Sequence, residues 1–459
     1  MTPAPHPPLI GVTVLPEFLQ SEGVEAVLDN LQRSGVNAVT TSPYVMEPAD
    51  ERTGSREPPD DAGAGSVRFL DRPLWGKREL FVRTAPSFIP ADELYRDLKY
   101  KPAAPTALTR RDGHVIHDLV RAAHALHMKA YLQVQAAIPP GYRVQFGGPD
   151  DDNRPRLPDG SLPKKRLAKN GSLASPHILA YQRALITDLA RQYPEIDGLR
   201  FDWPEYPPYF LDDFFLDFSG HARKFAAAHG IDFETARADA QRRYADLHHG
   251  NIVEQLPRLV SPDAPLVALK RTMVTELLRN FRGAMNDAGG QRIELVAHAF
   301  PPPWSVASGI DFAAASPHCS AVCVKLYTMH WLMMMRFYAD EIRQAAPGVD
   351  DRALAAALAR TFDIGEPPAS CNDYHYPGPH ENHAVDPAAL TRKIGEAQQQ
   401  AGDLPILPLA HGYGPAADFR RRLEATAPAA RHGFWVNRYG YLSDEKLCVI
   451  GEIAATLKR

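Results

Sequence analysis

Cysteine is scarce in this sequence, and neither sign of charge dominates. Only 4 of the 459 residues are cysteines, too few for a disulfide framework, so we expect reduced and mostly buried thiols. Lysine and arginine number 51 against 55 aspartates and glutamates, which leaves a formal net charge of −4. Nucleic-acid binding usually needs a clustered basic excess, so this balance predicts no nucleic-acid partner.

Long apolar runs are also missing. No stretch reaches the roughly 18 uninterrupted apolar residues of a membrane-spanning helix. Residues 1–8 are rich in proline and lack the basic and apolar regions of a secretory leader. These absences predict a cytoplasmic protein with no membrane partner.

Short apolar segments are present instead, and they alternate with helical patterns along the whole chain. Such alternation is typical of repeated βα units around a parallel sheet. The predicted strands cover residues 9–15, 37–42, 129–136, 197–202, 293–300, 321–327, 405–411 and 433–439. With a last helix over 444–457, the pattern predicts one domain over 1–459, an α/β fold of the (β/α)8 TIM-barrel type.

Several connections in this barrel are predicted to be long. Residues 43–111 and 139–171 are expected to form loops, and residues about 210–290 a helical insertion after the fourth strand. An open doubly wound sheet would usually carry a glycine-rich phosphate turn after its first strand, and residues 13–17 are not one. The long segments predict a walled pocket for short ligands, or equally a subunit interface in a homo-oligomer.

Polar residues recur at one end of the predicted strands. Alternate strand residues share a face, and barrel enzymes place their active sites at the carboxyl ends of the strands. Three tryptophans, Trp203, Trp304 and Trp331, follow strand ends, where indoles can stack on sugar rings. The residues expected to bind a substrate are Arg200, Trp203, Gln135, His298, Lys325, Tyr327, His411, Asn437, Tyr439, Trp304 and Trp331.

The fourth strand carries the most informative segment, residues 197–207. Arg200 and Asp202 share a face, so the guanidinium is expected beside the carboxylate, keeping Asp202 ionised. Glu205 follows in an aromatic, proline-rich turn, where a raised pKa would keep it protonated. Glycosidic hydrolysis uses two carboxyl groups in these opposed states.

Residues 198–202, Gly-Leu-Arg-Phe-Asp, resemble the G-x-R-x-D pattern at the fourth strand of the α-amylase clan. The wider sequence, at residues 123–130, 197–207 and 435–442, is similar to bacterial hypothetical glycoside hydrolase-like barrel families. The resemblance implies a (β/α)8 glycosidase acting on a carbohydrate, with Asp202 as the nucleophile.

The sequence departs from that clan in two places. The fifth strand ends in His298, where the clan carries its acid, and the seventh ends at His411 without an aspartate. The missing acid is therefore Glu205 or a loop residue, with Glu381 the second choice and Glu17 the third.

Three other classes of protein remain as alternatives. A metal-dependent barrel hydrolase would fit the 18 histidines, but residues 10–15 lack the His-x-His of amidohydrolase barrels and 380–383 lack helical zinc spacing. We therefore expect no metal and no cofactor. The remaining alternatives are a carbohydrate-binding barrel without catalysis, and a lyase or isomerase with a Tyr or His base.

Overall fold

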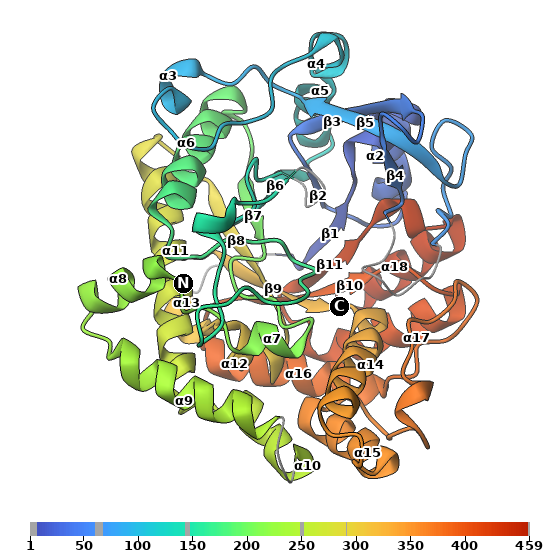
Figure 1. The fold of residues 1–459 in the computed structure, drawn as a ribbon. Helices are drawn as coiled ribbons and strands as arrows, with labels where there is room; N and C mark the ends of the chain where they lie inside the picture. Colours follow the sequence, from blue (N-terminus) through green and yellow to red (C-terminus); the bar gives the residue numbers. More distant parts are fainter. Residues whose placement is uncertain (1–6, 60–67, 143–146, 248–251, 291, 458–459) are drawn as a thin grey trace, which may run out of the picture.

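Eight parallel strands form a closed barrel at the centre of the computed structural model (Figure 1), in the order β1-β11-β10-β9-β8-β7-β6-β2. The structure describes residues 7–59, 68–142, 147–247, 252–290 and 292–457. The barrel strands are β1 (Leu9–Thr13), β2 (Ala38–Thr41), β6 (Lys129–Gln135), β7 (Gly198–Asp202), β8 (Glu294–Ala299), β9 (Ala321–Leu326), β10 (Ile406–His411) and β11 (Gly433–Asn437). The predicted TIM barrel is confirmed, and each strand end lies within two residues of its predicted position.

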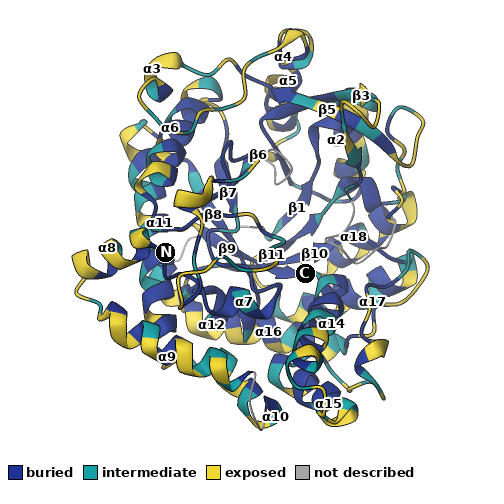
Figure 2. Cartoon of the chain, viewed as in Figure 1, coloured by how far each residue is buried: buried dark blue, intermediate teal, exposed yellow. Residues whose placement is uncertain are grey.

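Helices surround the barrel (Figure 1), and their inner faces are buried while their outer faces are exposed (Figure 2). The helix α6 shows how the sequence sets their ends. Its first turn contains Pro176, and the Ser175 hydroxyl accepts a hydrogen bond from the Ile178 amide, as the Ser-Pro pair predicts. The helices outside the fourth connection are α1 (Pro16–Ser21), α2 (Val24–Arg33), α3 (Asp92–Tyr95), α4 (Ala107–Asp112), α5 (Val115–Ala125), α6 (Pro176–Gln192), α12 (Trp304–Ser308), α13 (Phe312–Ala315), α14 (Thr328–Ala345), α15 (Asp351–Phe362), α16 (Pro387–Ala401), α17 (Ala416–Thr426) and α18 (Asp444–Leu457).

The connection from β7 to β8 is helical, as predicted, but its last helix belongs to the barrel. It contains α7 (Leu211–Phe214), α8 (Gly220–Ala228), α9 (Phe233–Asp246), α10 (Ile252–Gln255) and α11 (Pro265–Asp287). Helix α11 packs beside α6, and its Phe281 ring lies 4.5 Å from that of Phe201 in β7. It therefore takes the place of the fourth barrel helix, and the insertion proper ends before it.

The connection after β2 was expected to be a loop but contains a small antiparallel sheet. The strands β3 (Tyr44–Ala49) and β4 (Ser55–Glu57) both pair with β5 (Leu80–Pro86). This sheet stands at one side of the barrel in Figure 1, next to β1 and β2. Because Tyr44 reaches the cavity described below, the sheet forms part of its wall.

The amino-terminal half of the barrel is filled by an apolar layer. Its members are the buried side chains Ala38, Tyr131, Val296, Ala321, Cys323, Leu407, Leu409 and Trp435. The two largest, Tyr131 and Trp435, meet edge to face with ring centroids 5.4 Å apart. Glycines make room for both rings: a Cβ at Gly11 would lie 2.3 Å from Trp435, and one at Gly198 2.5 Å from Tyr131. The apolar layer closes the barrel from below.

Candidate active site

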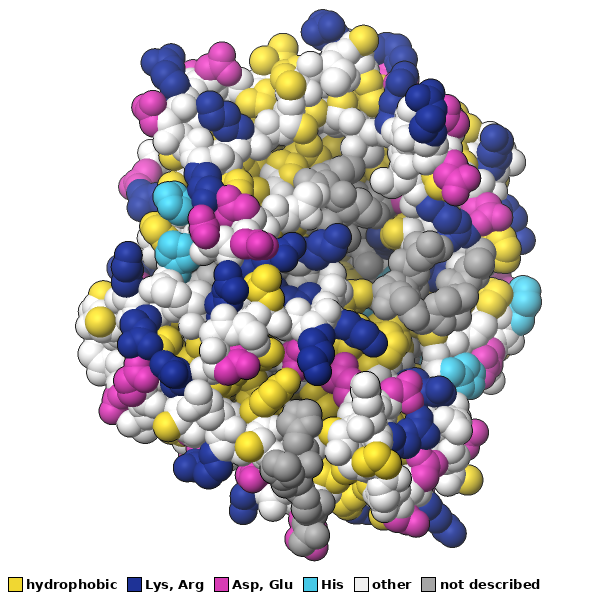
Figure 3. All heavy atoms as spheres, viewed as in Figure 1, with side chains coloured by type: hydrophobic (Ala, Val, Ile, Leu, Met, Phe, Trp, Pro, Cys, Tyr) yellow, Lys and Arg dark blue, Asp and Glu magenta, His cyan; other side chains and the backbone are white. Residues whose placement is uncertain are grey.

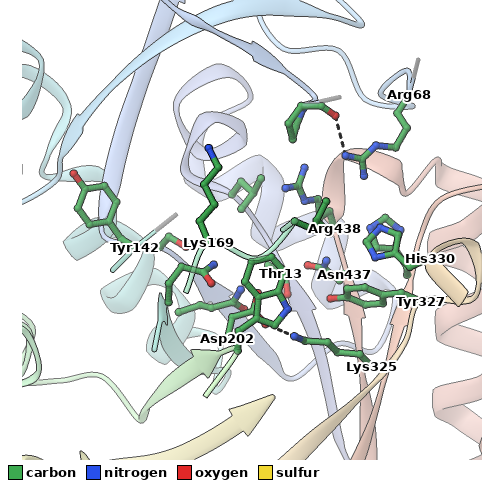
Figure 4. Close-up of a pocket in the computed structure, with 18 of the residues that line it drawn as sticks. Thr13, Arg68, Tyr142, Lys169, Asp202, Lys325, Tyr327, His330, Asn437 and Arg438 are labelled. Atoms are coloured by element: carbon green, nitrogen blue, oxygen red, sulfur yellow. Dashed lines mark hydrogen bonds and ion pairs between the residues drawn. The ribbon is translucent and has the colours of Figure 1, made fainter. Parts of the chain in front are cut away.

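A cavity of about 320 Å³ opens at the carboxyl end of the barrel strands. Figure 4 shows side chains from several strands and loops converging on it, with Asp202 and Lys325 close together. The lining residues are Thr13, Leu15, Ser42, Tyr44, Pro59, Arg68, Gln133, Gln135, Tyr142, Leu167, Lys169, Asp202, Trp203, Tyr209, Lys325, Tyr327, His330, His411, Asn437 and Arg438. Hydroxyl, amide, imidazole and aromatic groups dominate this set, which suits a polyhydroxylated ligand with apolar ring faces.

The Asp202 carboxylate is held by two side chains from the next two strands of the barrel, β8 and β9. Lys325 Nζ in β9 lies 2.6 Å from Asp202 Oδ1, and His298 Nδ1 in β8 lies 3.4 Å from the same oxygen. Burial alone would raise the pKa of Asp202, but the charge of Lys325 and the contact with His298 outweigh it, so the pKa lies well below its usual range. Burial and the charge of Arg200 lower the pKa of His298 to about 4. The site therefore presents an ionised carboxylate, a lysine and a neutral imidazole.

Arg200 lies elsewhere than the sequence suggested. Its side chain points into the barrel, where the guanidinium carbon lies 3.6 Å from the Trp435 ring centroid and an Nη donates to Cys323 Sγ at 3.5 Å. Two residues along a strand correspond to about 6.5 Å, so Arg200 sits one layer below Asp202. Lys325, which sequence analysis expected only to bind substrate, is the cation that pairs with Asp202.

The strand-end prediction places several residues at the cavity. Of the residues expected to bind a substrate, those that line it are Gln135, Trp203, Lys325, Tyr327, His411 and Asn437. His298 lies against Asp202 but does not line the cavity. His411 Nδ1 accepts a hydrogen bond from the Tyr413 amide at 3.1 Å, so a neutral ring carries its proton on Nε2.

Glu205 is fully buried and does not line the cavity. One carboxyl oxygen accepts the Phe300 amide at 2.8 Å, and the other accepts the Ser308 hydroxyl at 2.5 Å. Burial raises the pKa of Glu205 to about 7. The side chain thereby ties the turn after β7 to the segment after β8.

That turn contains Trp203, whose φ of 53° lies in the left-handed region that favours glycine. Its indole lines the cavity, with Lys325 Nζ 5.2 Å from the ring centroid. The contacts of Glu205 hold this uncommon backbone in place.

The other two candidate acids also lie apart from the cavity lining. Glu381, between α15 and α16, has 47% of its side chain exposed and is hydrogen-bonded to His375 Nε2 at 2.7 Å. Glu17 is fully buried in α1 and accepts the Tyr44 hydroxyl at 3.4 Å. Asp202 is therefore the one carboxylate among the lining residues in the described part of the chain.

Three aromatic residues expected to bind substrate are placed within the protein instead. Trp304 in α12 and Trp331 in α14 have ring centroids 5.4 Å apart, and both lie over Lys393 Nζ. The Tyr439 hydroxyl donates to Glu22 at 2.9 Å, beneath the Arg72 guanidinium. Helices α12 and α14 begin at or near these two tryptophans. The indole rings therefore pack between helices and do not lie at the strand ends.

Sequence reasoning missed the residues that loops bring to the cavity. They are Arg68, Tyr142, Lys169, Tyr209, His330 and Arg438. His330 and Arg438 follow strands β9 and β11 closely, and extending the strand-end search by a few residues would have found them. Strand alternation gives no signal for Arg68, Tyr142 or Lys169, because they lie in long irregular connections.

Within the described ranges, no group of three or more His, Cys, Asp or Glu side chains is arranged to hold a metal ion. No helix among those residues is both long and apolar enough to cross a bilayer.

Neither a protein-family model nor a curated protein matches this sequence. Solved structures that are similar to it include the β-galactosidase of the psychrophilic Marinomonas ef1, with a TM-score of 0.49, 11% identity, and coverage of 94% of this chain and 54% of that one. The catalytic domain of β-amylase from Paenibacillus polymyxa gives a TM-score of 0.47, 10% identity, and coverage of 96% and 95%. The Group IV chitinase of Ostrinia furnacalis gives a TM-score of 0.41, 9% identity, and coverage of 98% of this chain and 99% of that one. The chain thus spans about half of the β-galactosidase.

Proposed function

We propose that this chain is a glycoside hydrolase in which Asp202 is the carboxylate that faces the anomeric carbon. The observation that supports this most directly is an ionised carboxylate within a cavity lined by hydroxyl, amide, imidazole and aromatic groups. Such a carboxylate can attack the anomeric carbon or stabilise the positive charge that develops there. Trp203 and the tyrosines offer ring faces for the apolar side of a sugar.

The leaving oxygen needs a proton, and the described lining residues contain no second carboxyl group. Glu205 and Glu381 remain predictions for this role, although neither lines the cavity. We assign the role to His330, which does line it and whose Nδ1 lies 3.2 Å from the Tyr209 hydroxyl. Imidazole can both donate and accept a proton, as general acid–base catalysis requires. His411 suits this role less well, because its Nδ1 already accepts a backbone hydrogen bond.

A panel of chromogenic α- and β-glycosides and short oligosaccharides tests the proposal. The unchanged protein should release aglycone from at least one member, and Asp202→Asn should lower kcat about a thousandfold or more. Asp263→Asn, on an exposed residue of the insertion, is the matched control and should retain full activity. Undiminished turnover in Asp202→Asn would contradict the assignment. His330→Gln should lower kcat, with a larger loss on substrates whose leaving group needs protonation.

A sugar-binding barrel without catalysis is the second candidate. It is favoured by the close Asp202–Lys325 ion pair and by the lack of a second carboxylate among the described lining residues. Calorimetry separates the two candidates, because a binding protein would bind a glycoside with no turnover by the unchanged chain.

A further inference from the structure

The charge of the cavity lining differs from that of the whole chain. The formal net charge of the chain is −4, yet the described lining residues include four cationic side chains, Arg68, Lys169, Lys325 and Arg438, and one carboxylate, Asp202. Figure 3 shows Lys and Arg side chains, together with several Asp and Glu side chains, on the middle of the face viewed in Figure 1. Lys169 is exposed to solvent, the Arg438 side chain is 18% exposed, and Lys325 and Arg68 are buried. A lining with this many cationic groups attracts anionic ligands, and the hydrolysis of a neutral sugar does not require it.

Two of these five charges compensate each other. Lys325 and Asp202 form their ion pair at 2.6 Å, and the Lys325 side chain is only 2% exposed. Figure 4 shows Lys169, Arg438 and Arg68 on the side of the cavity away from this pair. The cationic side chains are thus separated into a paired group beside Asp202 and a second group farther from it.

Two members of the second group, Arg438 and Lys169, come from different parts of the chain. Arg438 directly follows β11, and its Nη1 lies 3.5 Å from Glu57 Oε1, which leaves the other guanidinium N–H groups without a partner in the described part of the chain. Lys169 lies in the connection before α6, and its ammonium has no ion pair with any described residue. Arg68 lines the same cavity and lies 5.8 Å from the Tyr441 ring centroid.

We propose that the sugar bound here is acidic, and that Lys169 and Arg438 bind its carboxylate, sulfate or phosphate group while Asp202 faces the anomeric carbon. A guanidinium and an ammonium together provide the charge-assisted hydrogen bonds that recognise such anions. A neutral sugar cannot form these charge-assisted hydrogen bonds, so the lining favours the acidic one. The proposal rests on a sugar occupying the cavity as in the proposed function, and it adds the chemical class of that sugar.

Matched pairs of sugars test the proposal by titration calorimetry. Methyl glucuronide and methyl glucoside, or methyl galacturonide and methyl galactoside, differ only at the sixth carbon. The acidic member should bind at least about tenfold more tightly at low salt, and its advantage should shrink as ionic strength rises. The 6-sulfate and 6-phosphate of the same sugars show which anion is preferred.

Variants then locate the anion. Lys169→Gln and Arg438→Gln should each reduce the acidic-to-neutral affinity ratio about tenfold or to near one. Lys224→Gln, on an exposed residue of α8, is the matched control and should leave the ratio unchanged. Equal binding of both members, preference for the neutral member, absence of binding by either, or a ratio that survives both variants would each overturn the proposal.

Turnover keeps the two proposals distinguishable. Cleavage of neutral glycosides with no preference for acidic ones would overturn the acidic substrate and retain the hydrolase. Selective binding of acidic sugars with no cleavage of any glycoside would overturn the hydrolase and retain the acidic ligand.

Discussion

The two halves of the barrel interior are built from the same eight strands and differ completely in chemistry. The amino-terminal half holds the apolar layer around Tyr131 and Trp435. The carboxyl-terminal half holds the cavity, with Asp202 and Lys325 in ion contact. Arg200 lies at the boundary, stacked on Trp435 below and two residues before Asp202 in the same strand. The comparison shows that a position along a strand decides whether an inward side chain serves packing or chemistry.

Removing the largest side chain of the apolar layer should have the largest effect on stability. Trp435→Ala leaves a cavity and deprives Arg200 of its stacking partner, so we expect the free energy of unfolding to fall by about 4 kcal/mol. Urea denaturation measures it. Trp75→Ala, on a partly buried residue of the β4–β5 connection, is the control. An equally large loss of unfolding free energy in this variant would mean that the apolar layer contributes no more to stability than other tryptophan sites.

Glu205 lies outside both halves of the barrel interior and should make the stability of the protein depend on pH. Its pKa in the folded chain is about 7, raised chiefly by burial, against an ordinary value of about 4.3 when unfolded. Between these values the folded state binds the extra proton, so this contribution to stability is present at low pH and is lost as pH rises toward 7.

The Glu205→Gln variant should therefore lose this dependence. From pH 5 to pH 8 the unchanged chain should lose about 3 kcal/mol of unfolding free energy relative to the variant. Denaturation at both pH values measures the shift. Parallel pH curves for the unchanged chain and the Glu205→Gln variant would refute the expectation.

Gly11 tests how tightly the apolar layer is packed around Trp435. An added Cβ would lie 2.3 Å from the Trp435 ring, so Gly11→Ala should lower the free energy of unfolding by about 2 kcal/mol through overpacking. In a Trp435→Ala background the same change should cost almost nothing, because the ring is gone. A double-mutant cycle in urea checks this, and additive losses would mean that the two residues do not compete for space.

The smallest expected effect concerns the ion pair in the cavity. Replacing Lys325 with methionine removes the cation that lowers the pKa of Asp202, so that pKa should rise. The acid limb of kcat/KM should then move to higher pH by about one unit, equivalent to about 1.4 kcal/mol. Lys224→Met serves as the control, and an unmoved acid limb would separate Lys325 from the ionisation of Asp202.

Periodicity predicted the barrel because each strand carries its own pattern of apolar residues. It did not predict the β3–β5–β4 sheet, whose strands contain Pro48 and Pro86 and have mixed exposure. Alternation likewise brought Gln135, Lys325 and Asn437 to the cavity. It could not tell that Arg200 would turn down onto Trp435, since both layers lie on the same face of a strand. Loop residues such as Lys169 depend on tertiary packing, which no local pattern records.

The contact between Asp202 and Lys325 also bears on the lifetime of a reaction intermediate. If Asp202 attacks the anomeric carbon, the resulting ester carries no charge opposite the Lys325 ammonium, whose side chain is 2% exposed. A buried ammonium without a counter-ion costs several kcal/mol. Hydrolysis of the ester restores the carboxylate and the pair together, so the covalent adduct should not accumulate during turnover. The lysine that keeps the nucleophile charged would thus also promote release of the sugar from it.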